Sequence, residues 1–391
     1  MNSKKCPLYG KCGGCQLLHL PYEKTIEFKK NYVLDCFKKE GINAKINKFI
    51  SAKEPYNYRN KMIIGFKIQN SKVVSGFYEE NSHKIIDLDY CIMHSELQNN
   101  IAKYIKQLII DYKIKPYDED RKTGVLRHVV IRIGIHTNEI MVILVTTDKK
   151  LGRQKDIVND ILSKYQNVKT IVQNINDKQT NAVLGVKNIK LYGNGYIFDK
   201  LGDFKFKISP LSFYQINPIQ TEVLYNKAIE FANLTGNEIV YDLYCGIGTI
   251  SLFVSKHAKQ VYGIESVKDA IKDANENKRI NKVNNVEFMA GRVENTLQSL
   301  SNKTSRPDVI FVDPPRSGLD KTAIQMLKNI SAPKIVYISC NPETLARDIK
   351  LLSDKYETQT IQPVDMFPHT SHIECVTVLT KKNLRRFLDE I

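Results

Sequence analysis

Three residues of this sequence, Asp313, Cys340 and Glu374, have types and positions that could perform covalent chemistry together. Asp313 opens the segment Asp-Pro-Pro-Arg, Cys340 lies within Ser-Cys-Asn-Pro, and Glu374 lies within His-Ile-Glu-Cys. A thiol can act as a nucleophile, while a separate carboxylate can act as a base. Because these groups follow a glycine-containing loop that could hold a cofactor, they predict an enzyme with a covalent mechanism.

That loop occupies residues 242–249 and reads DLYCGIGT, between a segment typical of a strand and one typical of a helix. Its two glycines let the backbone turn sharply and approach a ligand. The next predicted strand ends in Glu265, where a carboxylate can accept hydrogen bonds from ribose hydroxyls. The full G-x-G-x-x-G fingerprint is absent, which disfavours NAD and favours a nucleoside-like ligand such as S-adenosylmethionine. An ordinary structural turn is the alternative.

Asp313 and Cys340 each follow a predicted strand, and ligands of open α/β sheets bind beyond the carboxyl ends of the strands. Asp313 can present a carboxylate there, and Arg316 can engage a phosphate or a carbonyl oxygen. An isolated cysteine is usually a packing residue, but a strand end followed by Asn-Pro favours a nucleophile. Glu374 is the predicted base, since no other acidic residue after Cys340 is as well placed.

These groups suit the transfer of a methyl group to C5 of uracil, a carbon that is a poor nucleophile by itself. Addition of a thiolate to C6 turns C5 into an enolate carbon that can attack a methyl donor. A base then removes the C5 proton so that the thiol can leave. One cysteine, one carboxylate and one sulfonium cofactor suffice, without a redox step.

The elements that must position these residues are predicted from about residue 210 onward, where strands alternate with helices. This alternation is typical of a Rossmann-like α/β domain with a mostly parallel sheet. The predicted strands are 238–243, 260–265, 286–290, 309–312, 334–339, 358–363 and 375–380, and the predicted helices include 250–255, 267–282 and 321–329.

The preceding part of the chain predicts a different architecture. Residues 1–20 are rich in Cys and Gly, and a helix is expected over 22–40, closed by Gly41. Short strands and two helices then predict an α+β domain. We therefore expect a cysteine-rich loop over 1–20, a central α+β domain over 21–205 and the Rossmann-like domain over 206–391. The central strands are expected at 62–68, 73–78, 129–135 and 139–146, with helices at 96–112 and 152–164.

The net charge of the chain indicates its kind of partner, and its hydropathy indicates whether it enters a membrane. The chain has 391 residues and a formal charge of +16, from 58 basic and 42 acidic residues, which favours a polyanionic partner such as nucleic acid. Its richness in Lys, Asn and Ile can also reflect a general composition bias. No run of 18 apolar residues appears, and the N-terminus has no apolar segment behind its lysines. We therefore expect no membrane span, no signal peptide and a cytoplasmic protein.

Four of the eight cysteines form a possible ligand set: Cys6, Cys12 and Cys15, followed much later by Cys91. Cytoplasmic cysteines rarely form structural disulfides. Four thiolates could hold zinc or an iron–sulfur cluster, and unliganded thiols are the remaining alternative. The remaining cysteines outside the catalytic segment, which we expect to be packing residues, are Cys36, Cys245 and Cys375.

Taken together, the motifs resemble those of the S-adenosylmethionine-dependent RNA uracil-5-methyltransferases. The resemblance is carried by DLYCGIGT, Asp-Pro-Pro-Arg, Ser-Cys-Asn-Pro and His-x-Glu, and by residues 213–217, which match a Phe-x-Gln-x-Asn segment of the family. It extends over nearly the whole chain. It implies that Cys340 is the nucleophile and Glu374 the base, and that the cofactor is contacted by Gln215, Tyr244, Glu265 and Asp313.

The resemblance also bears on the cysteines and on RNA. The ribosomal-RNA branch of the family has this C-x5-CGGC…C arrangement with a [4Fe-4S] cluster, which implies a structural or RNA-positioning cluster on Cys6, Cys12, Cys15 and Cys91. Segments 58–62 and 126–132 are similar to family segments in which basic and aromatic residues could contact phosphates and stack on bases. A charged, exposed strand face is the alternative.

The resulting hypothesis is a monomeric enzyme that makes 5-methyluridine in 23S ribosomal RNA. In it, residues 1–20 form a cluster loop, 21–205 bind RNA and 206–391 carry the methyltransferase site. One alternative keeps the chemistry and takes the T-loop of transfer RNA as substrate. Another is a non-catalytic RNA-binding protein. Methylation of an amino group of adenine or cytosine is disfavoured, because that chemistry needs no thiol and usually has an aromatic residue in place of Arg316.

Overall fold

The computed structural model describes residues 6–80, 82, 84–178, 182–304 and 306–382, and it divides into two compact units. The first comprises the described residues up to Pro21 together with Glu54–Pro218. The second comprises Tyr22–Lys53 together with the described residues from Ile219 onward. Residues 1–5, on which the expectation of no signal peptide partly rests, lie outside the described residues. No described helix is both long and apolar enough to cross a membrane.

The second unit is built on a sheet of eight described strands in the order β1-β16-β17-β15-β14-β11-β12-β13. Strands β11 to β15 pair in parallel, whereas β17 is antiparallel to both of its neighbours. The bounds are β1 (Lys45–Ile46), β11 (Ile239–Leu243), β12 (Gln260–Glu265), β13 (Val286–Ala290), β14 (Val309–Val312), β15 (Lys334–Ser339), β16 (Tyr356–Val364) and β17 (Glu374–Lys381). The predicted Rossmann-like α/β domain with a parallel-rich sheet is confirmed.

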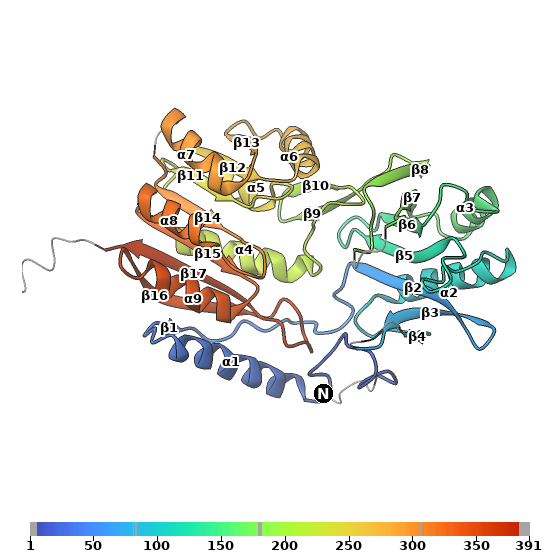
Figure 1. The fold of residues 1–391 in the computed structure, drawn as a ribbon. Helices are drawn as coiled ribbons and strands as arrows, with labels where there is room; N and C mark the ends of the chain where they lie inside the picture. Colours follow the sequence, from blue (N-terminus) through green and yellow to red (C-terminus); the bar gives the residue numbers. More distant parts are fainter. Residues whose placement is uncertain (1–5, 81, 83, 179–181, 305, 383–391) are drawn as a thin grey trace, which may run out of the picture. The chain divides into compact units, whose positions relative to one another are not determined.

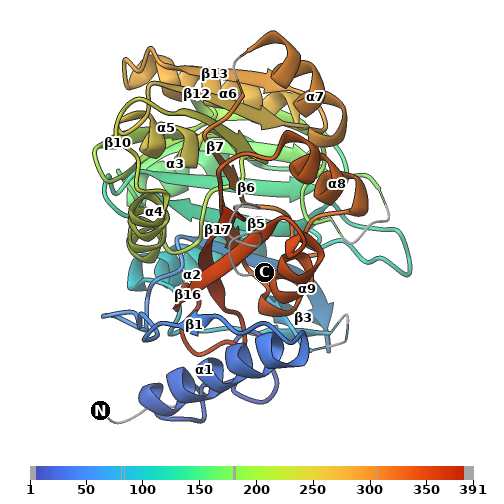
Figure 2. The ribbon, with the colours of Figure 1, turned by 90° about the vertical axis from the view of Figure 1, so that its left-hand side faces the viewer.

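Helices cover both faces of this sheet (Figure 1). On one face lie α1 (Tyr22–Lys39), α7 (Val293–Lys303), α8 (Lys321–Ile330) and α9 (Pro342–Leu352), whose apolar side chains share one core with the sheet. On the other face lie α4 (Pro218–Ala232), α5 (Thr249–Ser255) and α6 (Lys268–Ile280). Helix α1 packs on α9 and runs beside β1 (Figure 2).

The first unit contains a mostly antiparallel sheet of seven described strands, in the order β4-β3-β2-β5-β6-β7-β8. Helices α2 (Glu96–Asp111) and α3 (Gln154–Lys164) pack on it around a common core. The predicted α+β class is confirmed. The strands are β2 (Lys61–Gln69), β3 (Lys72–Tyr78), β4 (Ile85–Asp87), β5 (Leu126–Ile133), β6 (Ile140–Thr146), β7 (Val168–Ile175) and β8 (Lys187–Gly193), with a separate hairpin of β9 (Ile197–Leu201) and β10 (Phe204–Ile208).

The two compact units do not coincide with the predicted boundaries 1–20, 21–205 and 206–391. Residues Tyr22–Lys53, expected in the central domain, belong to the second unit because Val33, Cys36 and Phe37 are buried against its sheet and helices. At the other boundary, the first unit continues to Pro218. Apolar periodicity predicts that α1 is a helix, but it does not specify which core buries its apolar face.

Candidate active site and thiol cluster

The glycine loop follows β11, at the point where the strand order of the second unit reverses between β11 and β14. Gly246 and Gly248 both have positive φ, of 55° and 83°. A Cβ at Gly246 would meet no atom within 4 Å, so the backbone borders open space there, whereas at Gly248 it would lie 2.6 Å from Phe288 Cζ. Such a switch point is where open α/β sheets bind ligands.

Glu265 fixes the shape of this loop. Its Oε2 accepts a hydrogen bond from the Gly246 amide at 3.2 Å, and its Oε1 accepts one from the Val267 amide at 2.8 Å. The carboxylate therefore lies at the carboxyl end of β12, directly beside the open backbone of the loop. That position agrees with the predicted cofactor contact, which stays a prediction.

Asp242, at the end of β11, is fully buried and only partly hydrogen-bonded. Its Oδ2 accepts a hydrogen bond from the Ser251 hydroxyl, while its Oδ1 has no hydrogen-bond partner among the described residues. Burial raises the pKa of Asp242 to about 7, with a further contribution from the Asp313 carboxyl group. An unpaired buried acceptor is costly unless a ligand supplies a donor.

Strand register places Cys340 beside Glu374. The antiparallel pairing of β15 with β17 runs from Lys334 opposite Thr380 to Ser339 opposite Cys375. Cys340 directly follows Ser339 and Glu374 directly precedes Cys375, so the two residues flank the last pair of this register. The thiol is half-buried and the carboxyl group is only 3% exposed, and the Glu374 charge contributes to raising the pKa of Cys340.

The electrostatics show that Asp313 belongs to the same group. Burial raises the pKa of Asp313 to about 7. Burial, followed by the Asp313 charge, raises the pKa of Glu374 well above its usual range. Burial raises the pKa of Cys340 to about 11, and Glu374 and Asp313 add to this, while the Arg316 guanidinium opposes it. Crowded, buried carboxyl groups favour a cationic ligand, which would stabilise their charged forms.

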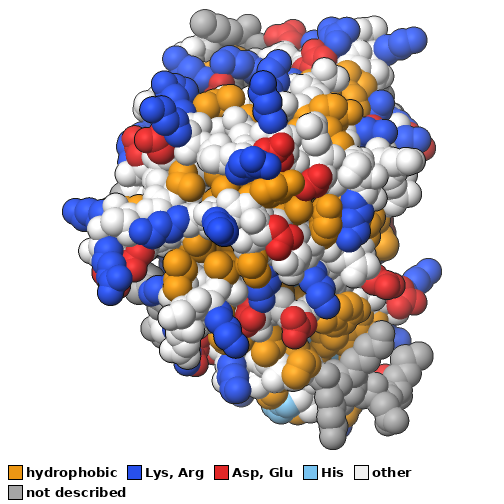
Figure 3. Space-filling model, turned by 90° about the vertical axis from the view of Figure 1, so that its right-hand side faces the viewer, with side chains coloured by type: hydrophobic (Ala, Val, Ile, Leu, Met, Phe, Trp, Pro, Cys, Tyr) orange, Lys and Arg blue, Asp and Glu red, His pale blue; other side chains and the backbone are white. Residues whose placement is uncertain are grey.

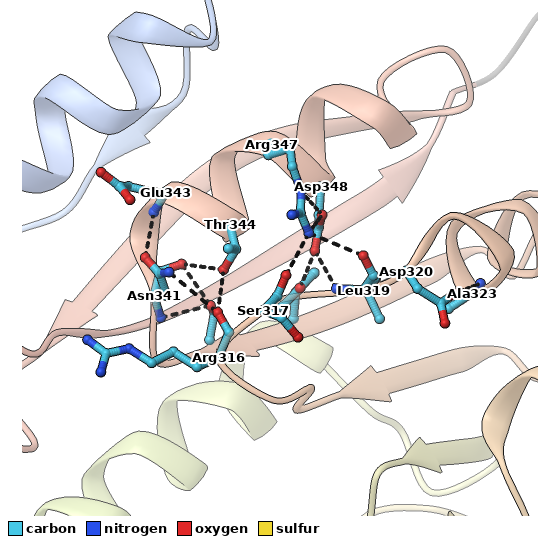
Figure 4. A network of polar contacts seen from close by, with 12 residues as sticks. Arg316, Ser317, Leu319, Asp320, Ala323, Asn341, Glu343, Thr344, Arg347 and Asp348 are labelled. Carbon is cyan, nitrogen blue, oxygen red and sulfur yellow. Dashed lines mark hydrogen bonds and ion pairs between the residues drawn. The ribbon is translucent and has the colours of Figure 1, made fainter.

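A hydrogen-bond network ties the loop after Asp313 to helix α9, which begins just after Cys340 (Figure 4). Asn341 is the N-cap of α9 and accepts a hydrogen bond from the Glu343 amide at 3.1 Å. Asn341 Nδ2 and Thr344 Oγ1 both donate to the Arg316 carbonyl at 3.4 Å. Further along, Asp348 accepts from the Leu319 amide at 2.8 Å. These hydrogen bonds therefore hold the loop after Asp313 against helix α9, which follows Cys340.

Of the other two predicted cofactor residues, Tyr244 packs against the core of the second unit and Gln215 belongs to the first unit. Tyr244, with φ of 67°, packs against the apolar core on the α7–α9 side, where burial and Glu294 raise its pKa. Its backbone therefore belongs to the glycine loop while its ring belongs to the core. Gln215 is in the first unit, where it is largely buried and its carbonyl accepts a hydrogen bond from Asn60 Nδ2 at 2.9 Å. The proposed contacts of both residues stay predictions.

The four predicted ligand cysteines meet in the first unit. Cys6, Cys12, Cys15 and Cys91 all line one cavity of about 680 Å³. Helix α2 holds Cys91 in place, because Asn99 in its first turn accepts from the Cys91 amide at 2.7 Å and donates to its carbonyl at 3.1 Å. Among the described residues, no group of three or more His, Cys, Asp or Glu could itself hold a metal ion.

Arg59 is the cationic neighbour of these thiols. Its Nη2 donates to the Gly14 carbonyl at 2.8 Å, and its charge opposes the rise in pKa that burial causes at Cys12, Cys15 and Cys91. Burial raises the pKa of Cys15 to about 12. A half-buried cation near three of the four thiols favours their deprotonated forms, which are the forms that act as metal ligands.

The two segments predicted to contact RNA are mostly buried. Tyr58, Arg127, His128 and Arg132 are each less than a tenth exposed. The guanidinium of Arg132 donates to the Ser212 carbonyl at 2.9 Å, so this cation makes a hydrogen bond within the first unit. The alternative of a charged, exposed strand face is therefore wrong for these four residues. Arg127, His128 and Arg132 are buried because they lie in β5, a central strand of the sheet. The predicted contacts with RNA stay a prediction.

The fold and the acidic site at the switch point define a Rossmann-like methyltransferase. Residues 21–382 match the family described as tRNA (Uracil-5-)-methyltransferase. The chain belongs to this family.

Relatives agree with this assignment. The chain is 46% identical over 380 residues to an "uncharacterized RNA methyltransferase" of Staphylococcus aureus, covering 96% of this chain and 84% of the relative. It is 46% identical over 381 residues to another of Halalkalibacterium halodurans, covering 97% and 83%. The crystal structure of Pyrococcus abyssi tRNA (uracil-54, C5)-methyltransferase with S-adenosyl-L-homocysteine is similar, with a TM-score of 0.79, 29% identity, and coverage of 96% and 87%. These findings support RNA methylation and S-adenosylmethionine as the methyl donor.

Sequence reasoning did not single out Asp242 or Asn341 as site residues. Asp242 was visible as the first residue of the glycine loop, but only the structure shows that one carboxylate oxygen is buried without a partner. Asn341 had a readable signal, because Asn followed by Pro is typical of an N-cap and the first residue of a helix.

Proposed function

We propose that this protein methylates C5 of uridine in RNA, with Cys340 as the covalent nucleophile and Glu374 as the base. Family membership supports RNA uracil methylation. The observation that supports the mechanism is that Cys340 and Glu374 flank the last residue pair of the β15–β17 register, in which Ser339 lies opposite Cys375. A nucleophile and a base this close can act on adjacent carbons of one ring.

In the proposed reaction, the Cys340 thiolate forms a bond to C6 of the uracil, and the electron pair of the C5–C6 double bond moves toward C5 and O4. When bound, S-adenosylmethionine would supply an electrophilic methyl group: C5 would form a bond to that methyl carbon, the bond between methyl and sulfur would break, and S-adenosylhomocysteine would leave. Glu374 then takes the proton from C5, the C5–C6 double bond re-forms, and the electron pair of the C6–S bond returns to sulfur. Accepting this proton converts the Glu374 carboxylate to the neutral acid. Burial raises the pKa of Glu374 and so favours that neutral form.

The residues present fit a sulfonium cofactor. Gly246 leaves open space at the loop, Asp242 Oδ1 lacks a partner among the described residues, and buried carboxyl groups at Asp313 and Glu374 favour a cation. We propose that Gln215, Tyr244, Glu265 and Asp313 hold S-adenosylmethionine, with Glu265 directed to the ribose hydroxyls.

We further propose that Cys6, Cys12, Cys15 and Cys91 bind a [4Fe-4S] cluster. This proposal is supported by the resemblance of the cysteine spacing to the ribosomal branch and by the four thiols that line one cavity, since such a cluster takes four thiolates. The proposed role of the cluster is structural or RNA-positioning. Iron and acid-labile sulfide should co-purify anaerobically with the wild-type protein and be lost from Cys91→Ala. Zinc in place of iron, in stoichiometric amount, would support the alternative ligand.

The proposed substrate is 23S ribosomal RNA, in line with the resemblance of the cysteine pattern to the ribosomal branch. The central domain and the cluster loop are the proposed RNA-binding parts of a cytoplasmic monomer. Lys and Arg side chains spread over the face seen in Figure 3, and the net charge of +16 supports a polyanionic partner. A second candidate is transfer RNA, favoured by the name of the Pyrococcus abyssi structure.

Tritium release from RNA labelled at uracil C5 tests the reaction and the substrate together. With S-adenosylmethionine, we expect release from a 23S transcript and none from a transfer RNA transcript. Release from transfer RNA alone would keep the chemistry and replace the substrate. Release from neither, under anaerobic conditions, would contradict the proposed function.

A further inference from the structure

Lys29 on helix α1 is a fully buried cation that has no role in the proposed reaction as described so far. Its Nζ donates to Asp365 Oδ1 at 2.6 Å, and neither side chain has any exposure to solvent. Lys29 also donates to the Phe367 carbonyl at 3.0 Å. Taking two charges out of water is costly, so a buried ion pair is retained only where its geometry is well satisfied.

Asp365 is held at each of its polar groups. Its Oδ2 accepts from the Tyr22 hydroxyl at 2.7 Å, its amide donates to the Ile50 carbonyl at 2.8 Å, and its carbonyl accepts from Gln220 Nε2 at 3.0 Å. The Tyr22 oxygen in turn accepts from the Ala52 amide at 2.8 Å. These partners belong to α1, to the segment 50–52 and to α4, so hydrogen bonds to three separate parts of the second unit fix the position of Asp365.

Asp365 begins the loop that ends in Glu374. Strand β16 ends at Val364, β17 begins at Glu374, and these two residues are paired opposite each other. The intervening residues, Asp365–Ile373, therefore form the connection that delivers the proposed base to its strand. His369 within this loop has φ of 62°, an unfavourable conformation for a residue with a side chain. Such a loop needs external contacts to keep its shape.

Hydrogen bonds continue from Lys29 along this loop to the loop after Asp313. The Phe367 carbonyl accepts from the Thr370 hydroxyl at 2.8 Å as well as from Lys29. The same hydroxyl accepts from the His372 amide at 3.2 Å. His372 Nδ1 lies 2.8 Å from Arg316 Nη2, and Arg316 follows Asp313 in the same loop.

We propose that Lys29 is a positioning residue for the proton-removal step: through Asp365 and the 365–373 loop, it holds Glu374 beside Cys340. This inference rests on the proposed function, because it takes Glu374 as the base. It gives Tyr22–Lys53, which is far from the active-site motifs in sequence but belongs to the second unit, a role in catalysis. The residue acts on catalysis without touching RNA or cofactor.

Lys29→Met tests this, because methionine keeps the length and apolar stem of lysine without its charge. Lys30→Met is the matched control, since Lys30 is the next residue of α1 and is exposed. For each full-length variant, we would measure tritium release from C5-labelled RNA, the covalent protein–RNA adduct on denaturing gels, thermal unfolding, and S-adenosylhomocysteine affinity.

For Lys29→Met, we expect tritium release to slow by about 10- to 100-fold, as for a base displaced by roughly 1 Å. The adduct should accumulate, because it forms but does not break down, while cofactor affinity stays within about twofold of wild type. Lys30→Met should behave as wild type. Adduct formation and tritium release that slow in parallel, or that do not change, would overturn the proposal.

If Lys29→Met does not fold, Tyr22→Phe decides, since it removes only one hydroxyl from the Asp365 carboxylate. Adduct accumulation in Tyr22→Phe supports the proposal, and an unchanged ratio of adduct to product overturns it. Failure of the proposed function is recognised separately, because the wild-type protein would then release no tritium, and the role of Lys29 would fall with it.

Discussion

At the scale of single residues, the site combines a thiol with carboxyl groups, and burial shifts the pKa of each of them upward. Burial raises the pKa of Cys340, Asp313 and Glu374 together, so the group as a whole disfavours negative charge. A cationic ligand would reverse this preference. Cofactor binding would therefore activate the nucleophile and the base at the same time.

The pH dependence of Cys340 follows from its pKa of about 11. The thiolate is the reactive form, so below this pKa the rate of alkylation by iodoacetamide should rise about tenfold per pH unit. Mass spectrometry of the Cys340 peptide, in the protein without cofactor, measures this rate apart from the other cysteines. Glu374→Gln removes a neighbouring acid and should shift the curve to lower pH. A rate that is already constant above pH 7 would contradict the raised pKa.

Glu374→Gln should also separate the two halves of the reaction. The amide has the size of the carboxyl group but cannot accept the C5 proton, so turnover should fall by about 10²- to 10⁴-fold. The Cys340–RNA adduct should accumulate on denaturing gels. Glu357→Gln, on an exposed position of β16, is the control. Normal product release by Glu374→Gln, without adduct, would remove Glu374 from the role of base.

At the scale of elements, helix α9 links the thiol to the loop after Asp313. Its Asn341 N-cap accepts from the Glu343 amide, so Asn341→Ala should lower the free energy of unfolding by about 1 kcal/mol. Asn341→Ser keeps a capping oxygen and should recover most of that loss. Chemical denaturation of the three proteins measures the differences. Equal stability of Asn341→Ala and wild type would show that this cap contributes nothing.

Most elements of the methyltransferase unit could be predicted from the sequence, since short apolar segments ending in Asp242, Glu265, Asp313 and Cys340 alternate with helical patterns. The antiparallel pairing of β17 with β15 could not. Apolar residues of a buried strand look the same in either direction, so the sequence does not state the pairing partner. It is this pairing that brings the end of β15, which Cys340 follows, alongside the start of β17 at Glu374.

At the scale of the whole molecule, residues distant in sequence complete each unit. The cysteine-rich N-terminal loop joins the first unit, while α1, which follows it directly, joins the second. The resemblance of the cysteine pattern to the ribosomal branch predicted that Cys6, Cys12, Cys15 and Cys91 act together, and these four residues line one cavity. The role of Lys29 could not be predicted, since a single lysine in an amphipathic helix gives no sign of a buried carboxylate partner.

The most direct test of the central claim is 5-methyluridine formation in RNA by the wild-type protein and by Cys340→Ala, measured by nucleoside mass spectrometry. Cys36→Ala, which removes a different thiol of the same unit, is the control. We predict that wild type and Cys36→Ala form 5-methyluridine and that Cys340→Ala is slower by at least about a thousandfold. Formation of 5-methyluridine by folded Cys340→Ala at the wild-type rate would contradict covalent catalysis by this thiol.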